Sequence, residues 1–163
     1  EVYDIAVKHM NDEGNINQWN DYNFFEVGVK KYINDGCFHV VLLENEIVGF
    51  FALIYGIDKT YNVIRYGNWL NNDEYVTIHK IAVKYYQKNI ASFILNYIID
   101  EIKNKNIYNI RIDTHKDNYP MKNLLGKLGF SHCGIIRLKN NEPRLAYQLY
   151  DQEKYYDKYY LKK

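Results

Sequence analysis

The chain has 163 residues, of which 47% are hydrophobic and 25% charged, and its formal net charge is +1. A chain of this length is most often a single domain that buries roughly 70% of the surface exposed by the unfolded chain. The balanced charge excludes a general attraction to nucleic acid or to an anionic membrane surface. Its two cysteines, Cys37 and Cys133, lack the spacing of a zinc site or a disulfide framework.

No apolar run approaches the roughly 20 residues that a membrane-spanning helix requires, and no signal-peptide pattern opens the chain. We therefore expect a reduced, metal-free protein of the cytoplasm.

Apolar spacing and turn residues predict an alternation of helices and strands. Asp35-Gly36 closes the second helix, and Asn45 and Glu46 alone separate the first two strands, which is typical of a hairpin. A polar loop over 57–74 precedes the third strand. The predicted helices cover 1–12, 21–34, 89–105 and 118–128, and the predicted strands cover 37–44, 47–56, 75–83, 107–115, 129–138 and 143–150.

The chain shows no linker between domains, so we expect one domain over 1–150. A charged, tyrosine-rich extension follows over 151–163, and we expect it to form a terminal helix.

The junction after the strand at 78–83 is suited to bind an anion. The strand is apolar and partly β-branched, and the apolar residues after it follow the spacing of one helical face: Ile90, Phe93, Ile94, Tyr97, Ile98 and Ile102. At the start of a helix several N–H groups lack an intrahelical partner and the macrodipole is positive, so the turn suits a diphosphate. Lys88 would add a positive charge. The residues of this turn are Gln87, Lys88, Asn89, Ile90, Ala91 and Ser92.

The second half of the chain contains a series of short segments in a recognisable order: TIHKIAV, QKNIASFILNYI, IRIDTH, DN, MKNLLGKLGF, CGII and RLAY. In order and spacing they resemble the GNAT superfamily of acyl-CoA-dependent N-acetyltransferases, and in particular a bacterial branch with the IRIDTH and RLAY motifs. The resemblance implies a mixed α/β fold with a bent, mostly antiparallel sheet and helices on both faces. It also implies a V-shaped splay between two central parallel strands, at 75–83 and 107–115.

The resemblance further implies where acetyl-CoA binds. The backbone of Ile81, Ala82 and Val83 would pair with the pantetheine arm like an added strand, and the turn from 87 to 92 would hold the diphosphate. Asn89 and Ala91 stand where the family usually has glycines; Asn tolerates left-handed backbone angles, and Ala permits close approach.

Asn118 corresponds to an Asn that hydrogen-bonds the cofactor in many relatives. Its alternative role is the N-cap of the following helix, and one residue can fill both roles.

Acyl transfer to an amine requires a neutral amine, a donor that polarises the thioester carbonyl and a proton for the leaving thiolate. Asp113 is a candidate base, because several peptide-acetylating relatives have a glutamate in this strand. The alternative is that Asp113 pairs structurally with Arg111 or His115. His79 is a second candidate, since imidazole titrates near neutral pH; the alternative is a half-buried structural histidine. Glu74 could orient a cationic acceptor or take its proton, although a loop acid is more often solvated.

Leu125 stands where many relatives have a tyrosine that protonates the departing thiolate. Because leucine has no proton to give, Tyr119, Tyr147 or water would serve, or coenzyme A would leave as a thiolate. Trp19 and Trp69 flank the segments that usually line the acceptor cleft, with core packing as the alternative.

We therefore expect acetyl transfer from acetyl-CoA to the primary amine of a small molecule, by direct attack in a ternary complex and without a metal. One alternative is acetylation of a protein or peptide. Another is a non-catalytic acyl-CoA-binding module, which the leucine at 125 and the altered glycines favour. The expected partners are acetyl-CoA and an amine acceptor, with no nucleic acid or membrane and with a possible homodimer.

Overall fold

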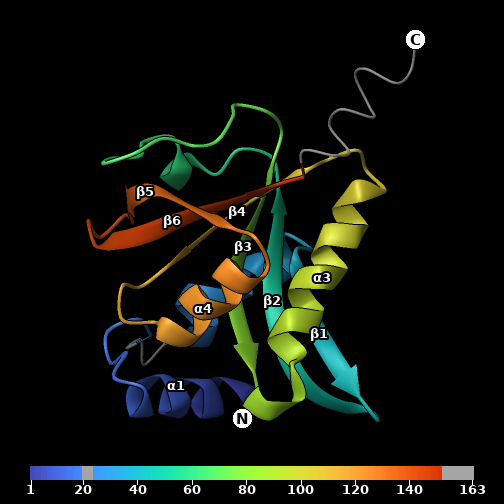
Figure 1. Ribbon diagram of the computed structural model, residues 1–163. Helices are drawn as coiled ribbons and strands as arrows, with labels where there is room; N and C mark the ends of the chain where they lie inside the picture. The colour runs from blue at the N-terminus through green and yellow to red at the C-terminus, as the bar shows by residue number, and fades with distance from the viewer. Residues whose placement is uncertain (20–23, 152–163) are drawn as a thin grey trace.

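A computed structural model describes residues 1–19 and 24–151; the expected helix in the extension from 152 onward lies outside these residues. The described part forms a six-stranded sheet in the order β1-β2-β3-β4-β6-β5, with helices on both faces (Figure 1). The strands are β1 (Phe38–Leu43), β2 (Glu46–Tyr55), β3 (Val76–Val83), β4 (Asn109–Thr114), β5 (Ser131–Arg137) and β6 (Pro143–Tyr150). The helices are α1 (Val2–Asp12), α2 (Lys30–Asn34), α3 (Ile90–Lys103) and α4 (Tyr119–Lys127).

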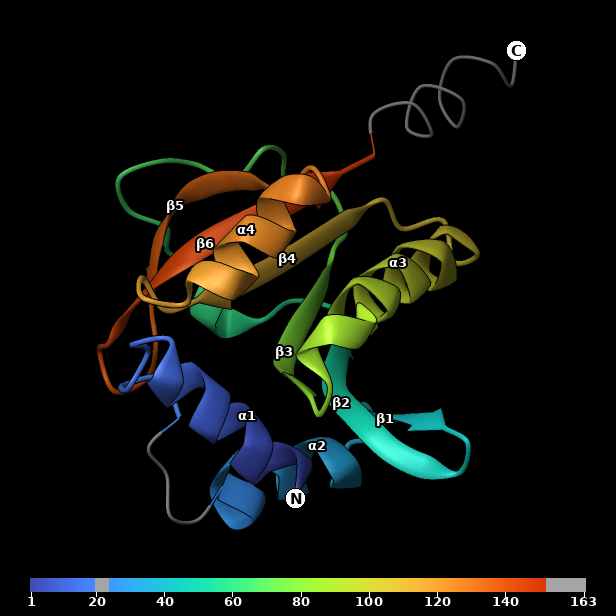
Figure 2. The same ribbon diagram turned by 60° about the horizontal axis from the view of Figure 1, so that its bottom comes forward.

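The strands pair antiparallel except β3 and β4, which run parallel at the centre of the sheet. Their ladder is short, because it joins Val76–Ile78 to Ile110–Ile112 and then ends. Beyond this point the two strands diverge, as Figure 2 shows. A register shift between β2 and β3 and a left-handed backbone at Lys80 (φ 57°) mark a bulge in β3 at the point of divergence. The predicted splay is confirmed.

The main core lies between the sheet and the helices α3 and α4. Burial in this core follows the helical period of α3, as predicted, and α4 contributes Leu125. Phe93 and Tyr97, which the spacing assigned to the buried face, are exposed and stack on each other with ring centroids 6.5 Å apart. The buried side chains of α3 are Ile90, Ile94, Leu95, Ile98 and Ile102.

The opposite face of β2 and β3 is covered by α1, through Val2 and Ala6 against Phe50 and Ala82. In the described residues no helix is long and apolar enough to cross a membrane.

Two local features differ from the sequence prediction. The hairpin turn between β1 and β2 uses Glu44 and Asn45, with φ angles of 48° and 67°, in place of Asn45 and Glu46. A two-residue turn with both φ angles positive matches the twist of the strands, so β2 starts one residue earlier. The predicted helix at 21–34 is a π-helical turn (Phe24–Val29) followed by α2, and residues 21–23 of that prediction lie outside the described chain.

The loop over 57–74 is fixed against β5 by close backbone approach. Arg65 and Ile135 exchange N–H to carbonyl bonds of 2.8 Å. A side chain at Gly67 would begin 2.0 Å from the carbonyl oxygen of Cys133, so a residue without Cβ is required there.

A buried polar cluster fixes the other end of this loop. The amide of Gln148 donates to Asn109 (2.8 Å) and accepts from the N–H of Leu70 (3.0 Å). The guanidinium of Arg111 lies between the rings of Trp69 and Tyr75, at 4.3 and 3.9 Å from their centroids. These contacts hold the end of the loop, whereas its start, which includes a 3-10 turn (Lys59–Tyr61), contacts β3 and β4 through Asp58 and Tyr61.

Candidate active site

The splay between β3 and β4 opens into two adjoining cavities. The first, called here the turn cavity, has a volume of about 470 Å³ and includes residues of the turn before α3. The second, called the histidine cavity, has a volume of about 500 Å³ and includes His79 and Asp113. The two cavities meet at the side chains that line both: Met10, Trp19, Ile81, Asn118 and Met121.

The turn cavity brings together most of the residues that we predicted to bind the cofactor: Ile81, Ala82, Val83, Asn89, Ala91, Ser92 and Asn118. Gln87 and Lys88 lie on the exposed 3-10 turn before Asn89 and line neither cavity. The side chain of Ile90 packs into the main core. Its N–H group is therefore the part that can contact a ligand.

The turn itself has the backbone geometry of an anion site. Asn89 adopts the left-handed conformation, with φ 54° and ψ 25°, and its side chain makes no capping hydrogen bond. The first bond of the helix runs from the N–H of Phe93 to the carbonyl of Asn89 (3.0 Å). The N–H groups of Ile90, Ala91 and Ser92 precede that bond, and they remain available to an anionic ligand.

The edge of β3 that faces the splay is open beyond Ile78. The N–H of Lys84 donates to the carbonyl of Val48 on β2 (2.8 Å). Because successive residues of a strand point to alternate sides, the N–H groups of Ile81 and Val83 face the splay. An extended ligand can pair with this edge as an added strand.

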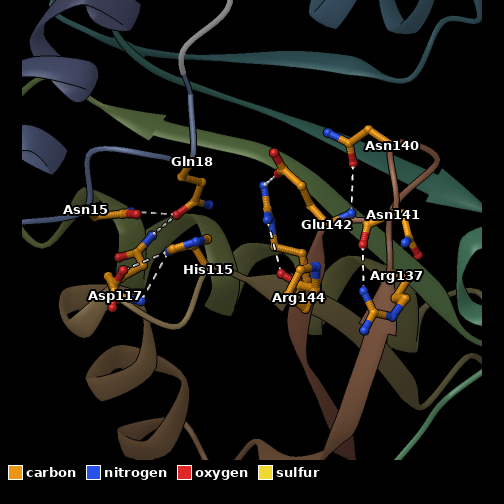
Figure 3. A network of polar contacts seen from close by, with 11 residues as sticks. Asn15, Gln18, His115, Asp117, Arg137, Asn140, Asn141, Glu142 and Arg144 are labelled. Atoms are coloured by element: carbon orange, nitrogen blue, oxygen red, sulfur yellow. Dashed lines mark hydrogen bonds and ion pairs between the residues drawn. The ribbon is translucent and has the colours of Figure 1, made fainter.

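Asn118 is the N-cap of α4 and also joins α4 to the segment after α1. Its side-chain oxygen accepts from the N–H of Met121 (3.1 Å), and its amide donates to Gln18 (2.9 Å). Gln18 also accepts from Asn15 (2.7 Å), and Figure 3 shows both side chains pointing from the segment after α1 toward the start of α4. Asn15 is 2% exposed, and its side-chain oxygen has no partner in the described structure. The sequence did not indicate Asn15 or Gln18 as site residues.

His79 and Asp113, the two candidate bases, lie close together in the histidine cavity. Nε2 of His79 is 2.8 Å from Oδ2 of Asp58, and Nδ1 is 3.8 Å from Oδ1 of Asp113. The hydroxyl of Tyr61 donates to the same oxygen of Asp113 (2.6 Å). Asp113 therefore pairs with Tyr61 and His79, and not with Arg111 or His115.

Burial and hydrogen bonds set the charges around His79. Burial alone would raise the pKa of Asp58, but bonds from His79 and from the N–H of Thr60 outweigh it and lower the pKa to about 2. Burial, together with the charge of Asp113, raises the pKa of Tyr61 well above its usual value. Burial, with the charge of Asp58 next, raises the pKa of Tyr32 to about 12. At neutral pH Asp58 is therefore a carboxylate, and both tyrosines keep their protons.

Sequence reasoning missed Asp58 and Tyr61. Asp58 starts the 3-10 turn, and its Oδ1 accepts from the N–H of Thr60 (2.8 Å). The order Asp-Lys-Thr is a local signal for a capped turn, and it carries no information about His79.

Several other candidate residues lie elsewhere. Glu74 is exposed and lines a separate hollow with Trp69. Trp69 donates from Nε1 to the carbonyl of Tyr61 (3.0 Å), so it stabilises the loop, whereas Trp19 lines both cavities of the cleft.

Leu125 is fully buried in the main core and lines neither cavity of the splay. Tyr119 and Tyr147, the expected substitutes for the missing proton donor, also lie outside both cavities, whereas the ring of Tyr32 lines the histidine cavity.

The low pKa of Asp58 predicts a pH-dependent contribution to stability. A carboxyl whose pKa is depressed by folding stabilises the fold above its unfolded pKa, and the contribution is lost as pH falls through the folded pKa. We expect Asp58→Asn to lower the free energy of unfolding by roughly 2 kcal/mol at pH 6 and by progressively less between about pH 4 and pH 2.

Urea unfolding of both proteins across this pH range measures the difference. Asp100→Asn, on the exposed face of α3, is the matched control and should show little change at pH 6. A loss of stability that is the same at every pH would contradict the assignment.

Comparison with known proteins identifies the family. The family model described as the acetyltransferase (GNAT) family matches residues 4–130 of the chain. The search of curated proteins gives no match.

Among solved structures, an acetyltransferase of the GNAT family from Streptococcus agalactiae is 26% identical, with a TM-score of 0.79, and the alignment covers 93% of this chain and 87% of that one. An acetyltransferase from Bacillus subtilis in complex with CoA is 16% identical, with a TM-score of 0.60 and coverage of 92% and 91%. A third structure is described as a putative streptothricin acetyltransferase from Bacillus anthracis in complex with acetyl coenzyme A. It is 23% identical, with a TM-score of 0.52, and the alignment covers 71% of this chain and 62% of that one. The resemblance read from the sequence is confirmed, because the family match spans well over half of the residues: the chain belongs to the GNAT family of acetyltransferases.

Proposed function

We propose that this protein transfers an acetyl group from acetyl-CoA to the primary amine of a small molecule, by direct attack in a ternary complex. One observation carries the proposal: the open edge of β3 leads from an anion-binding turn to the His79 and Asp113 pair. Membership of the GNAT family supports acetyl transfer, and two of the similar structures contain CoA or acetyl-CoA.

The residues of the turn cavity fit the donor. Its diphosphate would be held by the N–H groups at the start of α3, where the left-handed Asn89 exposes them. The pantetheine arm would pair with the N–H groups of Ile81 and Val83 along the open edge of β3. When bound, the donor supplies the thioester.

His79 is the proposed general base, and Asp58 determines which nitrogen acts. An ionised carboxylate can only accept hydrogen bonds, so Nε2 of a neutral His79 carries the hydrogen that it shares with Asp58. Nδ1 then keeps its lone pair on the side of Asp113. Asp113, held by Tyr61, would orient the incoming ammonium while Nδ1 takes its proton, directly or through water.

The departing thiolate would not meet a tyrosine at position 125. Tyr32 is the proposed proton donor in this region, because it lines the histidine cavity and is protonated at neutral pH; its pKa of about 12 makes it a weak acid toward a thiolate. A thiolate is also a far better leaving group than an alkoxide, since thiols are much more acidic than alcohols. Geometry and electrostatics are therefore expected to supply most of the rate.

The alternatives predict different results in a thermal-shift and thiol-release experiment. Millimolar acetyl-CoA should raise the melting temperature, whereas a nucleotide without a pantetheine arm, such as AMP, should not; no shift with acetyl-CoA would contradict the proposal. Release of free thiol with small primary amines supports the small-molecule reaction, and release with peptides alone supports peptide acetylation. Binding without thiol release for either class supports the non-catalytic module.

The left-handed turn at Asn89 gives a specific prediction for donor affinity. Asn89→Gly should preserve or improve the affinity for CoA, because glycine adopts φ 54° without cost. Asn89→Val should weaken it by about tenfold, since a β-branched residue in this conformation costs about 1–2 kcal/mol. Calorimetric titration with CoA measures both changes.

Asn106 has a similar backbone, with φ 59°, and lines neither cavity, so Asn106→Gly and Asn106→Val are matched controls for effects on folding alone. A large loss of affinity in Asn89→Gly would mean that the diphosphate binds elsewhere.

His79→Gln should lower kcat by roughly 100-fold or more while leaving the Kd for acetyl-CoA nearly unchanged, because a general base acts in the transition state and the donor binds in the other cavity. Steady-state thiol release and calorimetric titration separate the two quantities. His132→Gln, on the exposed face of β5, is the control. A kcat within threefold of wild type would refute the role of His79.

A further inference from the structure

Three residues that the sequence singled out and that the proposed reaction does not use lie around one hollow. Trp69, Glu74 and Arg111 line it, and its volume of about 490 Å³ is that of a small-molecule site. None of its described lining residues lines the turn cavity or the histidine cavity. This hollow, called here the arginine hollow, lies where β3 and β4 begin, whereas the turn that suits a diphosphate follows the end of β3 (Figure 1).

Arg111 brings a buried positive charge to the arginine hollow. Its side chain is 5% exposed, and no carboxylate of the described chain forms an ion pair with it. Nη2 donates to the carbonyl of Asn71 (2.8 Å), whereas Nε is buried without a hydrogen-bond partner in the described structure. Burying a charge is costly unless it is paired. The guanidinium therefore has capacity for an anionic partner.

The two rings that hold the guanidinium fix its orientation without neutralising it. Their centroids, on Trp69 and Tyr75, lie 4.3 and 3.9 Å from it, which is stacking distance. Burial lowers the pKa of Arg111, and the strongest opposing influence comes from the phenol of Tyr75, which is not a carboxylate. An anion that enters the hollow would meet a cation that is already held in place, so little further ordering is needed.

Two carboxylates, of Asp73 and Glu74, lie at the rim of the same hollow. Both side chains are exposed, and neither forms an ion pair with a described residue. They lie in the short segment between Asn71 and Tyr75, which both contact Arg111. The rim disfavours a ligand with negative charge alone, and the guanidinium disfavours one with positive charge alone. A ligand with one charge of each sign matches both.

The arginine hollow also offers apolar surface to a ligand. Ile57 lines it and is largely exposed, and the half-buried ring of Trp69 lines it as well. An aliphatic group that covers these two side chains would remove apolar area from water, which favours binding.

We propose that the arginine hollow binds a free amino acid with an aliphatic side chain. The carboxylate lies against Arg111, the ammonium against Asp73 or Glu74, and the side chain against Ile57 and Trp69. This binding site goes beyond the proposed acetyl transfer and does not depend on it.

Tryptophan fluorescence tests the proposal at the site itself, because the chain has two tryptophans and only one of them lines the arginine hollow. In Trp19→Phe, emission comes from Trp69 alone, and we expect leucine to change it saturably in the absence of acetyl-CoA. In Trp69→Phe, emission comes from Trp19, which lines both cavities of the cleft, and leucine should leave it unchanged. A change confined to Trp19, or no change at Trp69 up to the solubility limit of leucine, would overturn the proposal.

Two analogues of leucine test whether both charges are required. 4-Methylpentanoate has the same side chain and carboxylate but no ammonium, and leucinamide has the ammonium but no carboxylate. Measured by Trp69 emission in Trp19→Phe, each should bind about tenfold more weakly than leucine, as for one lost charged hydrogen bond. Binding of either analogue as tightly as leucine would contradict the assignment of a site for both charges.

Substitutions in the same Trp19→Phe background assign the two charges to residues. Asp73→Asn combined with Glu74→Gln should remove most of the advantage of leucine over 4-methylpentanoate, because both side chains are exposed and the fold does not depend on their charges. Glu44→Gln, in the turn between β1 and β2 and outside the hollow, is the matched control and should preserve the advantage. An unchanged advantage in the double variant would refute the role of the rim.

Arg111→Lys should weaken leucine binding by about tenfold, since an ammonium cannot present two parallel N–H donors to a carboxylate. Circular dichroism shows whether this variant is folded. If it is folded and binds leucine like the parent, the proposal is wrong. If it does not fold, the comparison of leucine with leucinamide in the parent decides the role of the guanidinium: equal binding refutes it, and weaker binding of leucinamide supports it.

Discussion

The short parallel ladder between β3 and β4 is the constraint on which the rest of the structure depends. The two strands pair over only three residues each, up to Ile78 and Ile112, and then separate. Had the ladder continued, the N–H groups of Ile81 and Val83 would be bonded to β4, and the cleft would be closed. Because it ends, the sheet has an unpaired edge in its interior, where the surrounding helices and loop protect it from pairing with another chain.

The position of His79 follows from the same divergence together with the loop over 57–74. The ladder places His79 and Asp113 just beyond the last paired residues, on strands that are still close together. The loop then brings Asp58 and Tyr61 to these two residues, and it is held by backbone contact at Gly67 and by the amide of Gln148. The arrangement of His79 and Asp113 with Asp58 and Tyr61 therefore depends on interactions that lie outside the two cavities.

The sequence predicted correctly those elements whose structure depends on residues close together in the chain. The helical period defined α3, the tolerance of Asn for left-handed angles fitted Asn89, and the resemblance to the GNAT superfamily placed His79 and Asp113 on neighbouring strands. Phe93 and Tyr97 were assigned wrongly, because the apolar stripe of α3 is wider than the surface that the sheet covers. Asp58 and Tyr61 lie in a polar loop without periodicity, and long-range contacts alone determine where it packs. The positive φ of Lys80 also has no local signal, since it results from the bulge in β3.

Amide hydrogen exchange with and without CoA tests the central claim most directly, because it reports whether the open edge of β3 receives a ligand. The account predicts that CoA slows exchange at Ile81 and Val83, which face the splay, and at Ile90, Ala91 and Ser92 at the start of α3. Exchange at Val40 and Leu42, on the outer edge of the sheet in β1, should not change. Protection confined to β1, or binding of CoA without protection of Ile81 and Val83, would contradict the account.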